Sequence, residues 1–204
     1  MGGNRIFNVE GNIAAGKSTL CALLDKSPLV KMIPEPVGVW QTDYPDNLLE
    51  RFYKDQYRWS FTFQMAAFIS RTMALEDVLA MDDHSNVILD RSVYCDRYVF
   101  AKSLNESGKM DDTEFRVYTD MWNWMSTKWI AKPEKIIYIK TSPEICLERI
   151  AQRSRGEEAD IPIEYLRHID RMHEEWLSKL DNVIVVDGSL QFDVDSILTE
   201  LNII

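Results

Sequence analysis

The chain has 204 residues, of which 46% are hydrophobic and 27% are charged. These fractions are typical of globular proteins and exclude a disordered or low-complexity chain. Acidic side chains outnumber lysine and arginine by 33 to 23, and the net charge of −10 argues against general binding to nucleic acid or to an anionic membrane.

Three widely spaced cysteines predict no disulfide framework and fit a reducing compartment. No apolar run is long enough to span a membrane, and the first residues contain neither a signal core nor a transit segment. We therefore expect a soluble, cytoplasmic protein.

Short apolar strands alternate with longer helical patterns along the chain. The expected strands are Arg5–Glu10, Leu29–Ile33, Asn86–Asp90, Lys135–Lys140 and Asn182–Val186. Helices are expected at Lys17 to about Leu24, 46–81, 96–105, 112–130, from Pro143, from Pro162 to about Lys179, and at the C-terminus. Strands separated by helices predict an α/β fold with a parallel sheet covered on both faces. Because no repeat, linker or change of composition divides the sequence, we expect residues 1–204 to form a single domain.

A phosphate-binding motif follows the first predicted strand. Residues 11–18, GNIAAGKS, match G-x-x-x-x-G-K-[ST] and lie between a strand and a helix, as the motif's mechanism requires. Backbone N–H groups of such a loop surround phosphate oxygens, the lysine neutralises the β- and γ-phosphates, and the hydroxyl ligates Mg²⁺. The residues expected to bind the donor are Gly11, Asn12, Ala14, Ala15, Gly16, Lys17, Ser18 and Thr19. The motif predicts binding of a nucleoside triphosphate with Mg²⁺.

Two further charged segments favour catalysis over simple nucleotide binding. Asp90 ends an apolar run and is followed by Arg91, which suggests a catalytic base or metal-associated acid beside a balancing cation. Arg149 and Arg153 share one helix face, and Arg155 follows them, as in a mobile lid that closes on transferred phosphates. Each segment also has a simpler interpretation, since a carboxylate can cap a turn and cations are common at helix C-termini.

The sequence resembles the deoxyribonucleoside kinase family, and the deoxycytidine/deoxyguanosine kinase branch in particular. The matching segments are EGNIAAGKST (10–19), PEPV (34–37), RWSFTFQ (58–64), DRSVYCDRY (90–98), the arginine segment 149–155 and IPIEYL (161–166). The resemblance implies the P-loop nucleoside and nucleotide kinase fold, with a five-stranded parallel sheet, flanking helices and an arginine-rich lid at about 149–161. It also implies ATP-dependent phosphorylation of the 5′-hydroxyl of a deoxynucleoside for nucleotide salvage, and a homodimer formed through helices.

The resemblance assigns the reacting groups. It makes Asp90 the catalytic base, lets Glu35 and Arg91 hold the 5′-hydroxyl, and places Mg²⁺ at Ser18 and Asp90. The residues it implies for the donor phosphates and donor base, besides the loop, are Arg149, Arg153, Arg155 and Phe192. Animal members usually have glutamate at the position of Asp90, so this shorter side chain must act from closer in or through a water. Gln191 replaces an acid of animal deoxycytidine kinase, so the choice of ATP or another triphosphate does not carry over.

The other implied residues bind the nucleoside itself. They are Trp40, Tyr53, Phe63, Gln64, Arg71, Asp96, Phe100 and Glu158. The resemblance implies that Tyr53 and Glu158 hold the sugar 3′-hydroxyl and that Gln64 reads the Watson–Crick edge of the base. The Arg71–Asp96 pair separates the cytidine and purine branch from the thymidine branch, and we expect Arg71 to keep Asp96 ionised.

Two alternative functions remain. A thymidylate-type nucleoside monophosphate kinase shares the loop, an Asp-Arg pair and an arginine lid, although Glu35 would repel an acceptor phosphate. A non-catalytic nucleotide-binding subunit is the second alternative. His84, His168 and His173 are too scattered to predict a zinc site, and we expect the aromatic helix with Trp122, Trp124 and Trp129 to serve core or dimer packing.

Overall fold

The computed structural model describes residues 4–80, 85–128, 132–153 and 155–204. His84 and Trp129 therefore lie outside the described residues. Five strands form one parallel sheet in the order β2-β3-β1-β4-β5. Their bounds are β1 Arg5–Gly11, β2 Val30–Ile33, β3 Asn86–Asp90, β4 Lys135–Lys140 and β5 Val183–Asp187. The predicted strands and the α/β class are confirmed, because short apolar runs separated by helices pair in parallel through right-handed crossovers.

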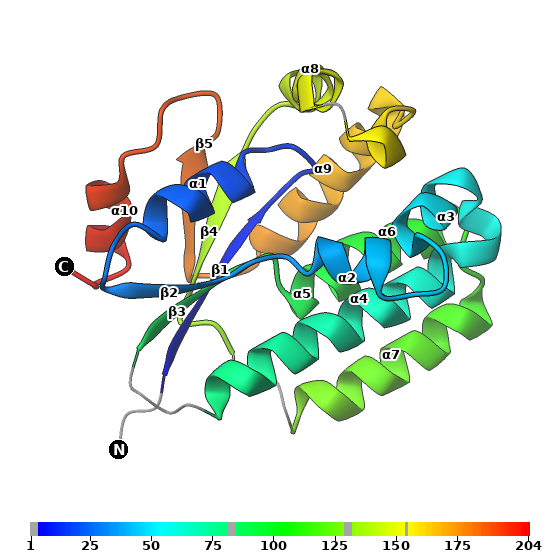
Figure 1. The fold of residues 1–204 in the computed structure, drawn as a ribbon, viewed down its shortest axis with the longest axis horizontal. Helices are drawn as coiled ribbons and strands as arrows, with labels where there is room; N and C mark the ends of the chain where they lie inside the picture. Colours follow the sequence, from blue (N-terminus) through cyan, green and yellow to red (C-terminus); the bar gives the residue numbers. More distant parts are fainter. Residues whose placement is uncertain (1–3, 81–84, 129–131, 154) are drawn as a thin grey trace.

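The helices cover both faces of the sheet, as Figure 1 shows. The α-helices are α1 Lys17–Leu24, α2 Val37–Thr42, α3 Leu48–Lys54, α4 Gln56–Leu79, α5 Val93–Cys95, α6 Lys102–Glu106, α7 Asp112–Ser126, α8 Pro143–Arg153, α9 Ile163–Leu177 and α10 Val194–Glu200. Two further segments are helical but not α-helical. They are the π-helix η1 Asp96–Ala101 and the 3₁₀-helix η2 Gly156–Glu158. None of the described helices is long and apolar enough to cross a membrane.

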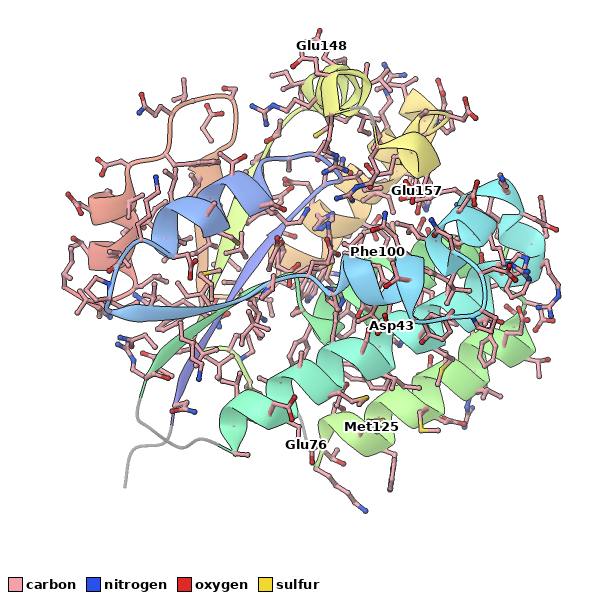
Figure 2. The ribbon with its side chains drawn as sticks, in the orientation of Figure 1. Asp43, Glu76, Phe100, Met125, Glu148 and Glu157 are labelled. Atoms are coloured by element: carbon pink, nitrogen blue, oxygen red, sulfur yellow. The ribbon has the colours of Figure 1, made fainter. Side chains whose placement is uncertain are left out.

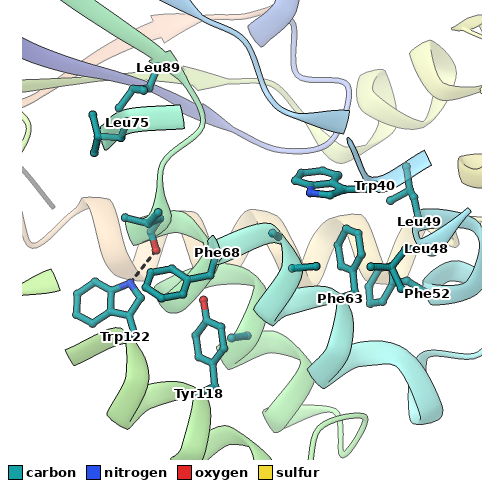
Figure 3. Close-up of a cluster of buried hydrophobic side chains, with 14 of the residues drawn as sticks. Trp40, Leu48, Leu49, Phe52, Phe63, Phe68, Leu75, Leu89, Tyr118 and Trp122 are labelled. Carbon is teal, nitrogen blue, oxygen red and sulfur yellow. Dashed lines mark hydrogen bonds between the residues drawn. The ribbon is translucent and has the colours of Figure 1, made fainter. Parts of the chain in front are cut away.

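Alternation along the strands divides the core into two layers. Ile6, Val87 and Leu89 join a cluster with α4 and α7 on one face, whereas Phe7 and Ile88 face a second cluster that includes α1, α8 and α10. Figure 3 shows the first layer, in which Trp122 of α7 donates a hydrogen bond of 3.0 Å to the carbonyl of Val93. Successive side chains of a strand point to opposite faces. The strands therefore pack against both clusters, and this packing fixes their position.

Several boundaries differ from the predicted ones. The segment 46–81 contains two helices, because Asp55 has the non-helical angles φ −146° and ψ 84° and its side chain caps α4 through the N–H of Arg58. Helix α2 was not predicted, since a six-residue helix after a proline has no readable periodicity. The segment 96–105 starts as a π-helix, and α7 ends at Ser126 instead of 130.

Candidate active site

A cleft of about 980 Å³ opens where the carboxyl ends of β1 and β3 meet the helices. Most residues predicted for donor and acceptor line this one cleft. They are Ala14, Gly16, Lys17, Ser18, Thr19, Glu35, Trp40, Tyr53, Phe63, Gln64, Arg71, Asp90, Arg91, Asp96, Phe100, Arg149, Arg153, Arg155, Glu158 and Phe192. In Figure 2, Phe100 lies near the centre of the molecule, between the sheet and the helical half. The described residues thus place both predicted binding sites in a continuous space.

The phosphate loop connects β1 to α1 and forms one end of the cleft. Gly11 has a φ of 152°, and a Cβ there would lie 2.7 Å from the carbonyl oxygen of Ile139. Gly16 has a φ of 114° and caps α1, so both positions need glycine. The Lys17 ammonium donates to the carbonyls of Asn12 at 2.8 Å and of Gly11 at 3.3 Å. It is thereby held at the mouth of the loop, at the N-terminal end of α1.

Three predicted loop residues lie behind the cleft surface and support the loop. Gly11, Asn12 and Ala15 are buried and do not line the cleft. The Asn12 side chain donates to the carbonyl of Leu166 at 2.9 Å and ties the loop to α9. The carbonyl of Ala15 accepts from the guanidinium of Arg149 at 3.0 Å. These contacts stabilise the backbone conformation in which the other predicted loop residues line the cleft.

Ser18 and Asp90 meet beside Lys17. The Ser18 hydroxyl donates to Asp90 Oδ2 at 3.0 Å, while Asp90 Oδ1 is buried and has no hydrogen-bond partner among the described residues. A carboxylate with a free oxygen beside a hydroxyl suits Mg²⁺, which prefers oxygen ligands and retains several waters. Burial raises the pKa of Asp90, although Lys17 opposes this shift. The residues present therefore fit the metal.

Glu35 lies between two arginines at the acceptor end. Its Oε1 atom accepts from Arg71 Nη2 at 2.6 Å and lies 3.3 Å from Arg91 Nε. Burial by itself would raise the pKa of Glu35, but Arg71, Arg91 and Lys17 together lower it to about 2. Glu35 is consequently ionised across the physiological range.

Arg91 is held in a left-handed conformation with φ 69°. Such angles cost a non-glycine residue on the order of 1–3 kcal/mol and persist where the surroundings determine them. Its Nη2 donates to the carbonyl of Gly11 at 3.1 Å, its Nη1 donates to Cys95 Sγ at 3.1 Å, and its guanidinium lies 4.7 Å from the Phe100 ring centre. The strained backbone directs this guanidinium between Glu35 and the phosphate loop.

The far end of the acceptor region combines a polar pair with aromatic walls. Asp96 accepts from Arg71 Nε at 3.0 Å and 3.2 Å through its two oxygens. Burial raises the pKa of Asp96 to about 6 despite Arg71, so the carboxylate is the main form at pH 7. Gln64 is buried, and its Oε1 has no partner in the described part of the chain. Trp40 and Phe63 pack edge to face with ring centres 5.2 Å apart, and Figure 3 shows both at this end of the core.

Glu158 joins the acceptor end to the predicted lid. It is buried in η2 and accepts from Arg155 at 2.9 Å and from Arg153. The adjacent Glu157, labelled in Figure 2, accepts from Gln41 and Asn47 at 2.9 and 2.8 Å, so η2 is fastened to the α2–α3 segment. The arginines of the predicted lid are thus paired with the residue that was predicted to hold the sugar.

The cleft also contains residues that sequence reasoning missed. Leu49 and Phe52 of α3 and Tyr165 of α9 line it, and Phe52 stacks on Phe63 with ring centres 4.5 Å apart. Tyr165 belongs to the IPIEYL segment, which could have indicated it. Phe52 carries no comparable signal, because an aromatic residue on an amphipathic helix is typical of any core.

Comparisons with known proteins agree with this geometry. The sequence profile described as "Deoxynucleoside kinase" matches residues 7–202. A probable deoxycytidine kinase of fowlpox virus is 40% identical over 196 residues, which cover 93% of this chain and 81% of that protein. Human deoxycytidine kinase is 39% identical over 199 residues, covering 86% and 76%. The mitochondrial thymidine kinase 2 of Macaca fascicularis is 35% identical over 174 residues, covering 85% and 64%. The chain belongs to the deoxynucleoside kinase family.

Proposed function

We propose that this deoxynucleoside kinase transfers the γ-phosphoryl group of ATP to the 5′-hydroxyl of deoxycytidine and deoxypurine nucleosides, with thymidine a poor substrate. The observation that carries the proposal is the acceptor end of the cleft. There the ionised Glu35 lies beside Arg91, and the Arg71–Asp96 pair lies beyond it. An ionised carboxylate suits an uncharged hydroxyl and repels an acceptor phosphate.

In the proposed reaction, Glu35 and Arg91 orient the 5′-hydroxyl, and Asp90 accepts its proton directly or through a water. The 5′-oxygen forms a bond to the γ-phosphorus as the bond to the β-phosphate oxygen breaks, and the electron pair leaves with ADP. Lys17, Arg153 and Arg155 neutralise charge on the phosphates. Phosphoryl transfer depends mainly on such positioning and charge stabilisation.

Mg²⁺ is part of the proposal through Ser18 and Asp90, supported by the free Oδ1 atom of Asp90. When bound with ATP, the metal neutralises charge on the β- and γ-phosphates. Phe192, which lies next to Gly16, is proposed to contact the donor base. We further propose that 149–161 acts as a lid within one domain formed by residues 1–204.

The base preference rests on matching donors and acceptors. Gln64 Oε1 and the Asp96 carboxylate are buried acceptors, and cytosine and adenine present an exocyclic amine with two N–H groups. The Gln64 amide can also donate to the neighbouring ring nitrogen. Thymine has a carbonyl oxygen in place of the amine, so two acceptors would face each other, and its methyl group would crowd Arg71. A buried unpaired polar group costs about 1–3 kcal/mol, which corresponds to roughly 5- to 150-fold discrimination.

A turnover assay tests the proposal. Purified protein with ATP and Mg²⁺ is given deoxycytidine, deoxyadenosine, deoxyguanosine and thymidine, and then dCMP and dTMP. We expect the highest activity on deoxycytidine and deoxyadenosine, and lower activity on deoxyguanosine, whose base has a carbonyl oxygen in place of the amine but no methyl group to crowd Arg71. Activity on thymidine and on both monophosphates should be weak. Efficient phosphorylation of dCMP or dTMP without activity on nucleosides would establish a monophosphate kinase. A preference for thymidine would refute the base assignment alone.

A homodimer through α4 and α7 is also proposed. These helices run side by side in Figure 1, and both expose apolar side chains. Ile69 and Met73 of α4 are 43% and 61% exposed, and Val117, Met121 and Trp124 of α7 are 50%, 38% and 53% exposed. Their i, i+3 and i+4 spacing places each set on one helix face, and apolar faces of this kind mark interaction sites.

Light scattering after size-exclusion chromatography tests the dimer. The wild-type chain should elute as a dimer, and the double variant Met73→Asp, Trp124→Asp should elute as a folded monomer. The control is Leu190→Asp, which changes an exposed apolar residue outside these helices and should remain dimeric. A monomeric wild-type protein contradicts the proposal.

A further inference from the structure

A buried group of potential metal ligands lies directly behind Arg91. Glu10 of β1, Cys95 of α5 and His173 of α9 each present one ligand atom, and these three atoms lie within 4.8 Å of one another. None of the three residues lines the cleft, and all are fully buried. The spacing of the histidines along the sequence did not indicate this group, because its members come from three distant elements.

We propose that Glu10, Cys95 and His173 form a binding site for a thiophilic divalent cation such as Zn²⁺, separate from the Mg²⁺ that accompanies ATP.

The distances suit tetrahedral coordination. Cys95 Sγ and His173 Nε2 are 3.5 Å apart. Zinc–sulfur and zinc–nitrogen bonds of about 2.3 and 2.05 Å at a tetrahedral angle separate these atoms by about 3.6 Å. The Glu10 oxygen has to approach the other two ligand atoms by no more than about 1.5 Å to complete the group. Two ligands are therefore already in place, and the third needs a small side-chain adjustment.

In the metal-free protein the Cys95 thiol can donate a hydrogen bond to His173 Nε2, and a bound metal would replace that thiol proton. His173 Nδ1 lies 2.8 Å from the carbonyl oxygen of Ile169, which can only accept, so Nδ1 carries the proton and Nε2 keeps its lone pair. This arrangement is the usual outer support of a metal-bound histidine. Burial lowers the pKa of His173 to about 3, which keeps the imidazole neutral. Glu10 Oε1 accepts from the N–H and hydroxyl of Ser92, whereas Oε2 is buried without a partner among the described residues.

The nearby arginine is compatible with a bound cation. Arg91 Nη1 donates to Cys95 Sγ, and a metal-bound thiolate keeps lone pairs for such a bond. Burial raises the pKa of Cys95 and of Glu10, so a divalent cation would have to displace protons from these groups on binding. The resulting thiolate and carboxylate, together with Glu35, would balance the charges of the cation and of Arg91. The sulfur ligand favours Zn²⁺ over Mg²⁺, because Mg²⁺ selects oxygen. Arg91 also lines the cleft, so an ion can arrive from the acceptor end.

Cobalt substitution tests the site without relying on turnover. Reduced, metal-free protein is titrated with Co²⁺, and the thiolate-to-cobalt charge-transfer band is measured in the near ultraviolet. We expect the band to saturate at one ion per chain and to disappear when Zn²⁺ is added. A cation on Ser18 and Asp90 has only oxygen ligands and gives no such band. Absence of the band in the wild-type protein overturns the proposal.

Matched cysteine variants assign the band. Cys95→Ser should abolish it and weaken Zn²⁺ binding at least about 100-fold, since even outer-shell changes cost 10- to 100-fold. Cys146→Ser is the control, because Cys146 is an equally buried thiol whose Sγ lies near a backbone carbonyl oxygen at 3.8 Å. A band that persists in Cys95→Ser and is lost in Cys146→Ser overturns the assignment. Thermal melting checks that both variants fold.

Crystals grown with Zn²⁺ give a second measurement that needs no variant. An anomalous difference peak at the zinc edge between Glu10, Cys95 and His173 supports the site. Peaks confined to Ser18, Asp90 or surface carboxylates overturn it.

Discussion

The phosphate loop and the acceptor region share one cleft but are built from different kinds of contact. The loop consists of eight consecutive residues, and its lysine is held by backbone carbonyls of the same loop. The acceptor region brings together Glu35 from the segment after β2, Gln64 and Arg71 from α4, and Asp96 from η1, and its charges are already paired with one another. A triphosphate therefore meets a lysine whose hydrogen bonds go to loop carbonyls and whose charge is shared with the nearby carboxylates of Asp90 and Glu35. A nucleoside instead meets ion pairs whose charges are already neutralised. It also meets buried polar atoms, such as Gln64 Oε1, that have no hydrogen-bond partner among the described residues.

This difference explains how each end achieves selectivity. Donor phosphates carry a high charge, so a preformed loop and a cation suffice for binding. A nucleoside is uncharged, and discrimination between bases depends on whether buried polar atoms are satisfied.

The largest effect on kcat is expected from Asp90 and Lys17, which lie between the donor end and the acceptor end of the cleft. Asp90→Asn keeps the shape of the side chain and should lower kcat at least about 100-fold, because a positioned acid or base contributes about 10²–10⁴. Lys17→Ala should reduce kcat by a similar factor by removing charge from the phosphates. Steady-state kinetics with deoxycytidine measures both. The control Asp181→Asn changes an exposed carboxylate just before β5 begins and should leave kcat unaltered. Near-normal kcat in Asp90→Asn would transfer its role to another group, with Glu35 the first candidate.

The next effect concerns the acceptor region alone. Replacing the buried pair by Arg71→Met with Asp96→Ala should raise thymidine activity and lower deoxycytidine activity. The change in the ratio of kcat/KM values should fall within roughly 5- to 150-fold, the value of one unpaired buried polar group. An unchanged ratio would show that the base is read elsewhere in the cleft.

A smaller effect should link the two ends through Glu158. Donor phosphates compete with Glu158 for Arg153 and Arg155, and the freed carboxylate can then bind the sugar. A non-hydrolysable ATP analogue with Mg²⁺ should therefore raise deoxycytidine affinity about fivefold, at the lower end of coupling between sites. Calorimetry measures the difference. Glu158→Gln should remove the coupling, and the control Glu157→Gln should retain it; equal coupling in both variants would contradict the linkage.

The smallest effect is a pH dependence of base choice. Burial raises the pKa of Asp96 to about 6 against the opposing charge of Arg71, so this side chain accepts hydrogen bonds above pH 6 and is protonated below it. The ratio of kcat/KM for deoxycytidine over thymidine should fall several-fold from pH 7 to pH 5. Glu35 stays ionised because its pKa is about 2, so it cannot cause the change. Asp96→Asn should remove the pH dependence of the ratio, and a constant ratio in the wild-type protein would contradict the assignment.

The sequence by itself determined where the five strands lie along the chain and the position of the phosphate loop. Helix α1 begins at Lys17, as predicted, and β3 ends at Asp90. These features are local, because hydrophobic periodicity and a Gly-rich turn act within a few residues. The resemblance to a known family extended the prediction to side chains such as Gln64 and Arg71, which no periodicity singles out.

Only the tertiary structure decided which of these side chains meet. The break at Asp55, the stacking of Phe52 on Phe63, and the pairing of Glu158 with the lid arginines depend on contacts between distant segments. The proximity of Cys95 and His173, 78 residues apart, has the same origin. Packing brings such groups together and burial then changes their charge states, and neither effect leaves a periodic pattern in the sequence.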